Sequence, residues 1–261
     1  MRSICDDLDA EHRDLDSIVA GLDDAQWGTD TSSPGWTIRD QISHLWSFDQ
    51  RAVLALTDLD AFAADTHWVA SHGGTDASIV PGRSMASADL LHHWRAERDE
   101  LIDIARSLDP STRVQWYGPP MGARSFITAR LMETWAHGQD VADALGVVRR
   151  PTERLRHVAH IGVRARPFSY VLRGMATPEV DVAVHLTAPD GEHWDWGESD
   201  VDTVSGTAAD FCLVVTQRRH LADTGLRVVG DVAAEWMSIA QAFAGSPGPG
   251  RQPGQFTVTD R

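Results

Sequence analysis

Apolar side chains recur three or four residues apart in four stretches of the first half of the chain. This spacing is typical of α-helices that bury one face and leave the other in water. Four amphipathic helices of similar length predict a helical bundle. The expected helices cover residues 4–22, 38–57, 90–108 and 126–144, the last with Ser125 as its N-cap and Gly146 after its end.

Two local signals refine this pattern. Thr37 and Asp40 have the spacing of a capping box, which predicts that the second helix begins at about Ile38. Residues 58–84 are polar, rich in Gly, Asp and His, and show no sustained apolar period. They therefore predict a long loop over one end of the bundle, and loops of this kind often line ligand sites.

The pattern changes in the second half of the chain. Apolar and polar residues alternate before and after the turn Asp190-Gly191, which predicts a β-hairpin. Helical spacing is found at 152–163, 207–215 and 232–243, and a short candidate strand at 226–229.

Together these elements predict an α+β protein. The expected parts are a helical bundle at 1–150, a connecting helix and linker at 151–179, a small α/β domain at 180–244, and a Gly- and Pro-rich mobile tail at 245–261.

Composition narrows the class of ligand. The formal net charge of -15 argues against binding to nucleic acid or to an anionic membrane, because both need a positive protein surface. No apolar run approaches the roughly 18 residues that cross a bilayer, and the acidic N-terminus is unlike a signal peptide. Cys5 and Cys212 alone supply neither a disulfide framework nor a cysteine metal site. We expect a cytoplasmic protein that binds small molecules.

The candidate chemistry lies on the fourth expected helix. Glu133, His137, Asp140 and Ala144 are spaced four, three and four residues apart and therefore share one face. A carboxylate and an imidazole are costly to bury in a bundle unless each has a partner, and a divalent cation would satisfy both. His44 on the second helix offers a third ligand, and three protein ligands of this type suit Zn²⁺ with an open fourth position.

Other interpretations of these residues remain open. Glu133 and His137 could form an ordinary ion pair on a solvated helix face, with His44 a hydrogen-bonded core residue. Asp140, one turn beyond His137, is the best candidate for a partner of a metal ligand or for a general base.

Two segments around these residues resemble a known family. The strings Trp36-Thr-Ile-Arg-Asp-Gln-Ile-Ser-His44-Leu and Arg130-Leu-Met-Glu-Thr-Trp-Ala-His-Gly-Gln-Asp140 are similar to the DinB-like superfamily, within it the mycothiol-dependent maleylpyruvate isomerase branch. The resemblance implies a DinB-like four-helix bundle and a C-terminal domain similar to sterol-carrier domains. It also implies that His44, Glu133 and His137 bind zinc.

The resemblance further implies a thiol-using enzyme, with mycothiol in the fourth coordination position as a thiolate. Addition of the thiolate to a small electrophilic acid would lead to an isomerase or an S-transferase. The branch uses a C-terminal arginine in catalysis, for which Arg218 and Arg219 are the candidates, although their Thr-Gln-Arg-Arg context departs from the Gly-Arg ending expected there. A second group of seven arginines between Arg149 and Arg173 could also bind carboxylates.

Two other classes of function compete with this one. The first is a ligand carrier with a structural metal, which predicts an apolar cavity within residues 180–244. The second is a metal-dependent hydrolase, which needs a general base such as Asp140 close to the ion. Oligomeric state, a homodimer included, is left open by the sequence.

Overall fold

The structure is a computed structural model that describes residues 1–71, 74–118 and 120–256. The chain folds as two compact units, Met1–Val148 and Arg149–Arg261. The first is helical apart from one short hairpin, and the second combines a sheet with helices, so the predicted α+β class is confirmed. In the part of the chain that is described, no helix is both long and apolar enough to span a membrane.

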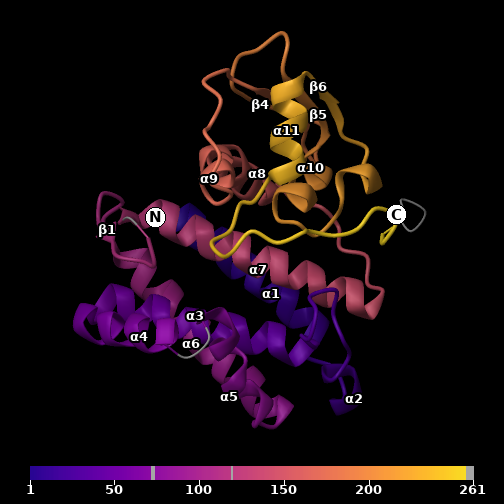
Figure 1. The fold of residues 1–261 in the computed structure, drawn as a ribbon. Helices are drawn as coiled ribbons and strands as arrows, with labels where there is room; N and C mark the ends of the chain where they lie inside the picture. The colour runs from indigo at the N-terminus through magenta and orange to yellow at the C-terminus, as the bar shows by residue number, and fades with distance from the viewer. Residues whose placement is uncertain (72–73, 119, 257–261) are drawn as a thin grey trace. The chain divides into compact units, whose positions relative to one another are not determined.

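Four long helices build the first unit, as the apolar pattern predicts. They are α1 (Arg2–Val19), α3 (Ile38–Thr57), α6 (Ser87–Ser107) and α7 (Ala123–Leu145). Figure 1 shows α1 running alongside α7, and α3 packs against both α6 and α7. Their buried faces share a core that includes Leu15, Ile42, Leu45, Trp94 and Val141. The first helix ends three residues earlier than expected, and a short helix, α2 (Asp24–Trp27), follows it.

The predicted capping box of α3 is confirmed. The Thr37 side chain accepts from the backbone N–H of Asp40, while the Asp40 carboxylate accepts from the backbone N–H of Thr37 at 2.9 Å. Two of the four backbone N–H groups that a helix start leaves unpaired are thereby satisfied, which favours Ile38 as the first residue of α3.

The expected N-cap of α7 is wrong, because Ser125 lies inside the helix. Two short strands, β1 (Arg113–Val114) and β2 (Met121–Gly122), pair as a hairpin that leads directly into Ala123. The C-terminal end is confirmed, since Gly146 caps the helix with a φ of 65°, a conformation that favours glycine.

The long loop expected at 58–84 is also wrong. The described part of this segment forms α4 (Leu59–Ser71), the 3₁₀ turn η1 (Gly74–Ser78) and α5 (Val80–Arg83), while residues 72–73 lie outside the described residues. The Asp58 carboxylate accepts from the Ala61 N–H at 3.0 Å near the start of α4. Phe62 and Val69, seven residues apart, are both buried. Tertiary contacts thus stabilise a helix whose apolar face is too sparse to recognise from the sequence.

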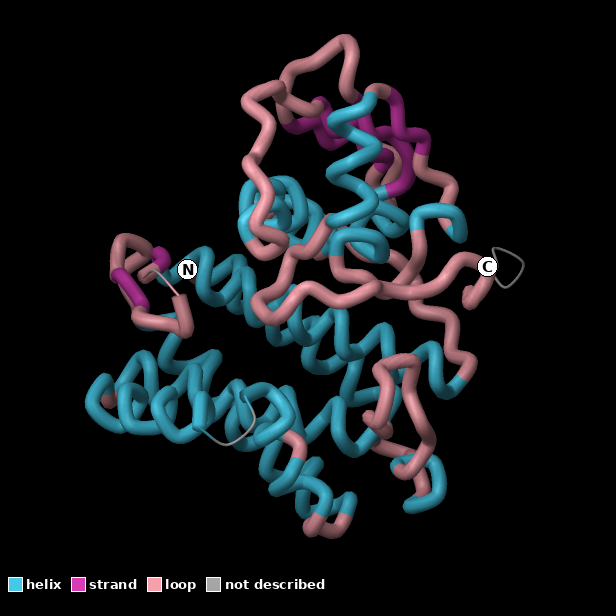
Figure 2. The backbone as a smooth tube through the Cα atoms, viewed as in Figure 1, coloured by secondary structure: helices cyan, strands magenta, loops and turns pink. Residues whose placement is uncertain are grey.

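The second unit contains a four-stranded sheet with strand order β4-β3-β5-β6. Figure 2 shows the strands of this sheet in magenta and the helices of the unit in cyan. The predicted hairpin is confirmed as β3 (Ala183–Thr187) and β4 (His193–Trp196), and the candidate strand as β6 (Arg227–Val229). The sequence did not predict β5 (Thr203–Thr207), which pairs parallel with β3 and antiparallel with β6. The segment Thr-Val-Ser-Gly-Thr contains one large apolar residue, so it lacks the alternation that identifies a strand.

The helices of the second unit are α8 (Leu155–Arg164), α9 (Arg166–Val171), α10 (Ala208–Val215) and α11 (Asp231–Ile239), with a 3₁₀ turn, η2 (Leu221–Asp223). Three of them match predicted helices, whereas α9 was not expected. The last helix ends at Ile239, four residues before the expected end, because Ala240 turns to an extended conformation. Within the expected tail, the Gly254 N–H donates to Asp223 at 2.7 Å.

Candidate metal centre

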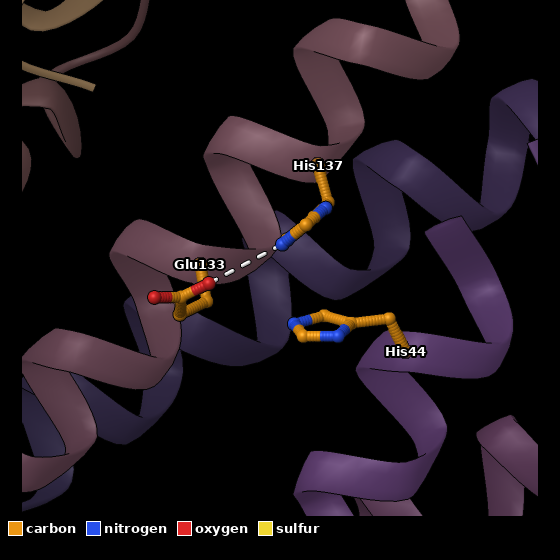
Figure 3. A group of neighbouring side chains, drawn as sticks. All are labelled: His44, Glu133 and His137. Carbon is orange, nitrogen blue, oxygen red and sulfur yellow. Dashed lines mark ion pairs between the residues drawn. The ribbon is translucent and has the colours of Figure 1, made fainter. Parts of the chain in front are cut away.

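Three side chains from two helices converge inside the first unit. His44 lies in the second turn of α3, and Glu133 and His137 lie one turn apart on α7. Figure 3 shows them pointing toward one another, and their nearest ligand atoms all lie within 4.8 Å of each other. We call this group the His–Glu–His triad. The structure therefore brings together the three residues that the sequence proposes as ligands.

The burial of the triad bears on the solvated-face alternative. His44 and His137 are 7% and 8% exposed, and the Glu133 side chain is 23% exposed. The burial of His137 does not match an ion pair on a solvated helix surface, whereas a buried, hydrogen-bonded His44 fits both interpretations. The partial exposure of Glu133 means that one side of the triad is accessible to solvent.

The spacing of the triad fits a divalent ion. Ligand–zinc distances of about 2.0–2.1 Å place two ligands of a tetrahedron roughly 3.3 Å apart. The Nε2 atom of His137 lies 3.3 Å from Oε2 of Glu133. All three ligand atoms lie within 4.8 Å of one another, so the set is somewhat wider than such a tetrahedron. Two imidazoles and one carboxylate are a donor set of catalytic zinc sites, although other first-row metals use it as well.

Each histidine of the triad has a hydrogen-bond partner on its other ring nitrogen. The Nδ1 atom of His137 lies 2.5 Å from Oε1 of Gln41, and Nδ1 of His44 lies 2.9 Å from the hydroxyl of Ser78. Metal-binding histidines usually have such partners, which orient the ring. Sequence reasoning missed both partners. Gln41 precedes His44 by one helical turn and could have been noticed, whereas Ser78 lies in a turn that was expected to be an irregular loop.

Aromatic rings surround the two imidazoles. Trp36 stacks on His137 with ring centroids 6.0 Å apart, and Phe48 lies 4.6 Å from His44. Tyr117 packs edge-on against Phe48 and is 39% exposed. Burial raises the pKa of the Tyr117 phenol to about 12, so this hydroxyl is protonated at neutral pH. The rings limit the access of water to the imidazoles, which strengthens electrostatic interactions there.

The N-terminal domain model of mycothiol maleylpyruvate isomerase matches residues 8–142, more than half of the chain and all of the triad. The chain belongs to this family. Two relatives of this mycothiol maleylpyruvate isomerase family member, from two strains of Mycobacterium tuberculosis, are described as uncharacterized proteins. Each is 45% identical over 248 residues, which is 94% of this chain and 96% of the relative.

Solved structures support the fold of this family member. The crystal structure of the mycothiol-dependent maleylpyruvate isomerase is similar with a TM-score of 0.58 and 17% identity, over 84% of this chain and 89% of that one. A crystal structure of a histidine-to-alanine mutant of that enzyme gives a TM-score of 0.57 at 18% identity, with the same coverage. At such low identity the likeness establishes the fold alone.

Asp140 lies on α7 one turn beyond His137 in this family member. It is fully buried, and its carboxylate accepts from the hydroxyl of Ser33 at 3.2 Å. The described hydrogen bonds of the triad histidines go to Gln41 and Ser78 instead. A role for Asp140 as a general base remains a prediction.

Arg218 and Arg219 follow α10 in the second unit. Arg218 is buried and donates to the backbone oxygen of Thr216 at 2.6 Å. Arg219 donates to the backbone oxygen of Arg218 at 2.7 Å, and its guanidinium lies 3.9 Å from the ring centroid of Phe256. Both side chains thus have local partners, and their part in catalysis also remains a prediction.

Proposed function

We propose that this protein is a metal-dependent enzyme that uses mycothiol, with a divalent ion, zinc in the first instance, held by His44, Glu133 and His137. The observation that carries the proposal is the convergence of these three ligand atoms within 4.8 Å, inside the domain that matches the family model. Likeness to the mycothiol-dependent maleylpyruvate isomerase supports the choice of thiol.

The ion and the residues around it have separate roles. When bound, the ion acts as a Lewis acid and lowers the pKa of a thiol at its open position. The triad holds the ion, while Gln41 and Ser78 orient the two imidazoles. Substrate carboxylates need cationic partners, which is the role we assign to Arg218 and Arg219.

The reaction begins with addition of the thiolate sulfur to one alkene carbon of a small electrophilic acid, so that the double bond becomes single. Rotation about that bond followed by expulsion of the thiolate restores a double bond with trans geometry, which is an isomerisation. Protonation of the neighbouring carbon instead leaves the sulfur attached, which is an S-transfer. Asp140 is the candidate that would supply or remove this proton.

Two hollows in the second unit bear on the carrier alternative. One has a volume of about 220 Å³ and is lined by small residues such as Pro151 and Ala188. The other has a volume of about 480 Å³ and is lined by polar residues that include His185 and Asp200. Ligand sites commonly enclose roughly 300–1,000 Å³ and are mostly apolar. The first hollow is smaller than this range and the second is lined by polar residues, so neither favours an apolar cargo.

The test is metal analysis of the purified protein combined with calorimetric titration of mycothiol. We expect one equivalent of divalent metal, and thiol binding that disappears when the metal is removed. His137→Ala should abolish both, because it removes one of three ligands. His92→Ala, an exposed histidine on α6, is the matched control and should change neither.

Incubation of the loaded protein with mycothiol and a cis-enedioyl acid then separates isomerase from transferase by the product. A wild-type protein that binds no divalent metal would overturn the proposal. Metal binding with cleavage of the substrate by water in the absence of any thiol would identify a hydrolase instead.

A further inference from the structure

Gln41 connects α3 to both α7 and the segment that precedes α3. Its side chain is fully buried, and the amide has a partner at each end. The nitrogen Nε2 donates to the hydroxyl oxygen of Thr31 at 2.9 Å, and the oxygen Oε1 lies 2.5 Å from Nδ1 of His137. A buried amide with both ends engaged has a single orientation that satisfies all of its partners.

The hydroxyl of Thr31 determines which way the amide points. It donates its one proton to the backbone oxygen of Trp36 at 2.8 Å, so it is an acceptor toward Gln41. The end of the amide that faces Thr31 must therefore be the NH₂ group. The carbonyl oxygen then faces His137, and because this oxygen only accepts, Nδ1 of His137 carries the proton.

A proton on Nδ1 leaves Nε2 of His137 as the nitrogen with a lone pair in the neutral ring. This is the atom that lies 3.3 Å from the Glu133 carboxylate, inside the triad. The hydrogen-bond chain from Trp36 through Thr31 and Gln41 therefore selects the tautomer that can bind an ion. The same segment contacts His137 a second time through the stacked Trp36 ring, whose plane is 14° from that of the imidazole.

Gln41 also affects the charge of the centre. Metal-binding histidines often donate to a carboxylate, which adds a negative charge near the ion. Here the partner of His137 Nδ1 is the side-chain amide of Gln41, which is neutral. With Glu133 as the one anionic ligand of the triad, a divalent ion keeps a formal charge of about +1. Such a centre favours an anionic fourth ligand.

We propose that Gln41 is a positioning residue that presents Nε2 of His137 to the ion and keeps the centre cationic, so that it prefers a thiolate as its fourth ligand. This inference rests on the proposed metal centre. The inference extends the proposed metal centre by assigning a role to Gln41, a residue that neither binds the ion nor touches the substrate.

The test compares two substitutions of similar length in the metal-free protein, titrated with Zn²⁺ and with Co²⁺. Gln41→Met removes the acceptor, and we expect metal affinity to fall by about 10- to 100-fold. Gln41→Glu retains an acceptor for Nδ1, and we expect it to bind the metal at least as tightly as the wild type. Gln50→Met, on the same helix, is the matched control and should leave the affinity unchanged.

Two further readouts distinguish positioning from a general loss of structure. The Co²⁺ absorption spectrum reports ligand geometry, and it should change in Gln41→Met and be restored in Gln41→Glu. The affinity of the Co²⁺-loaded protein for 2-mercaptoethanol reports the preference for a thiolate, and it should weaken in Gln41→Glu because of the added negative charge. Thr31→Val, which removes the hydroxyl that orients Gln41, should show a smaller loss of metal affinity.

Wild-type affinity for metal in Gln41→Met would overturn the positioning role, and so would an equal loss in Gln41→Glu. Unchanged thiol affinity in Gln41→Glu would overturn the charge argument. Failure of the wild type itself to bind metal is a different result, because it would overturn the proposed function.

Discussion

Two polar clusters lie in the same helical bundle, and α3 and α7 contribute to both. One is the His–Glu–His triad. The other, which we call the buried ion-pair cluster, consists of His12, Asp49, Arg98 and Arg130 from the four long helices. In this second cluster the fully buried Asp49 carboxylate accepts from two nitrogens of Arg130, at 2.9 and 3.2 Å.

The clusters differ in what neutralises the carboxylate. Asp49 faces a guanidinium, which is always protonated, so the protein itself balances the charge. Glu133 faces the imidazole of His137, which is neutral when it serves as a ligand. A carboxylate beside neutral imidazoles can bind an external cation, whereas the charge of a carboxylate paired with arginine is already balanced, which lowers its affinity for a cation. This contrast separates a candidate ligand site from a structural network made of similar residue types.

His12 illustrates the same point. Its Nε2 atom lies 4.0 Å from Oδ2 of Asp49, a pairing that could suggest a second metal site. Burial lowers the pKa of His12 well below 6.5, and the charges of Arg98 and Arg130 act in the same direction. The two arginines that disfavour a proton on His12 also disfavour a metal ion there.

The largest expected effect comes from removing one charge in each cluster. Asp49→Asn leaves Arg130 buried without its anion, which should lower the free energy of unfolding of the metal-free protein by about 3–5 kcal/mol. Glu133→Gln should cost less than about 1 kcal/mol in the same protein, since Glu133 is partly exposed, yet it should strongly weaken metal binding. Urea denaturation and metal titration measure the two quantities. Equal losses of stability would remove the distinction between the clusters.

A smaller effect should appear in the pH dependence of stability. Because His12 is held neutral in the fold, the unfolded chain binds a proton near pH 6.5 that the folded protein excludes. The contribution of His12 to the free energy of unfolding is thus fully present above pH 6.5. It is lost as the pH falls below that value, with a slope of at most about 1.4 kcal/mol per pH unit. Urea midpoints of the metal-free protein between about pH 7 and 5 should fall more steeply than those of His12→Gln. Urea midpoints that fall equally with pH in the two proteins would contradict the conclusion that the fold keeps His12 neutral.

The smallest effect should come from the helix that both clusters share. Thr37→Ala removes the N-cap of α3 and should reduce the free energy of unfolding by about 1 kcal/mol. Metal affinity should change little, because the hydrogen bonds of the cap join Thr37 to Asp40 and neither residue belongs to the triad. Thermal unfolding with and without metal tests this, and a large loss of affinity would show that the start of α3 controls the site.

Much of the first unit could be predicted from local patterns. The bounds of α3 follow from its apolar period and its capping box, and the end of α7 follows from Gly146. Helical spacing alone places Glu133 and His137 on one face. Choosing His44 as the third ligand also required the prediction of a helical bundle, because His44 lies on a different helix.

Other features could not be predicted because they depend on distant partners. The helix α4 is stabilised by burial of Phe62 and Val69, and β5 is a strand because it pairs with β3 and β6. Gln41 contacts a histidine that is 96 positions away, and no spacing along the chain reveals such a pair.

The sequence by itself therefore determined the class of fold, the main helices and the residue types of the candidate site. The fold class and the helices depend on the periodicity of apolar side chains, and the residue types depend on the chemistry of each side chain. Only the tertiary structure decided which polar residues of the bundle meet each other. Whether a buried carboxylate faces an arginine or two imidazoles is set by the packing of helices far apart in the chain, and that choice separates the triad from the buried ion-pair cluster.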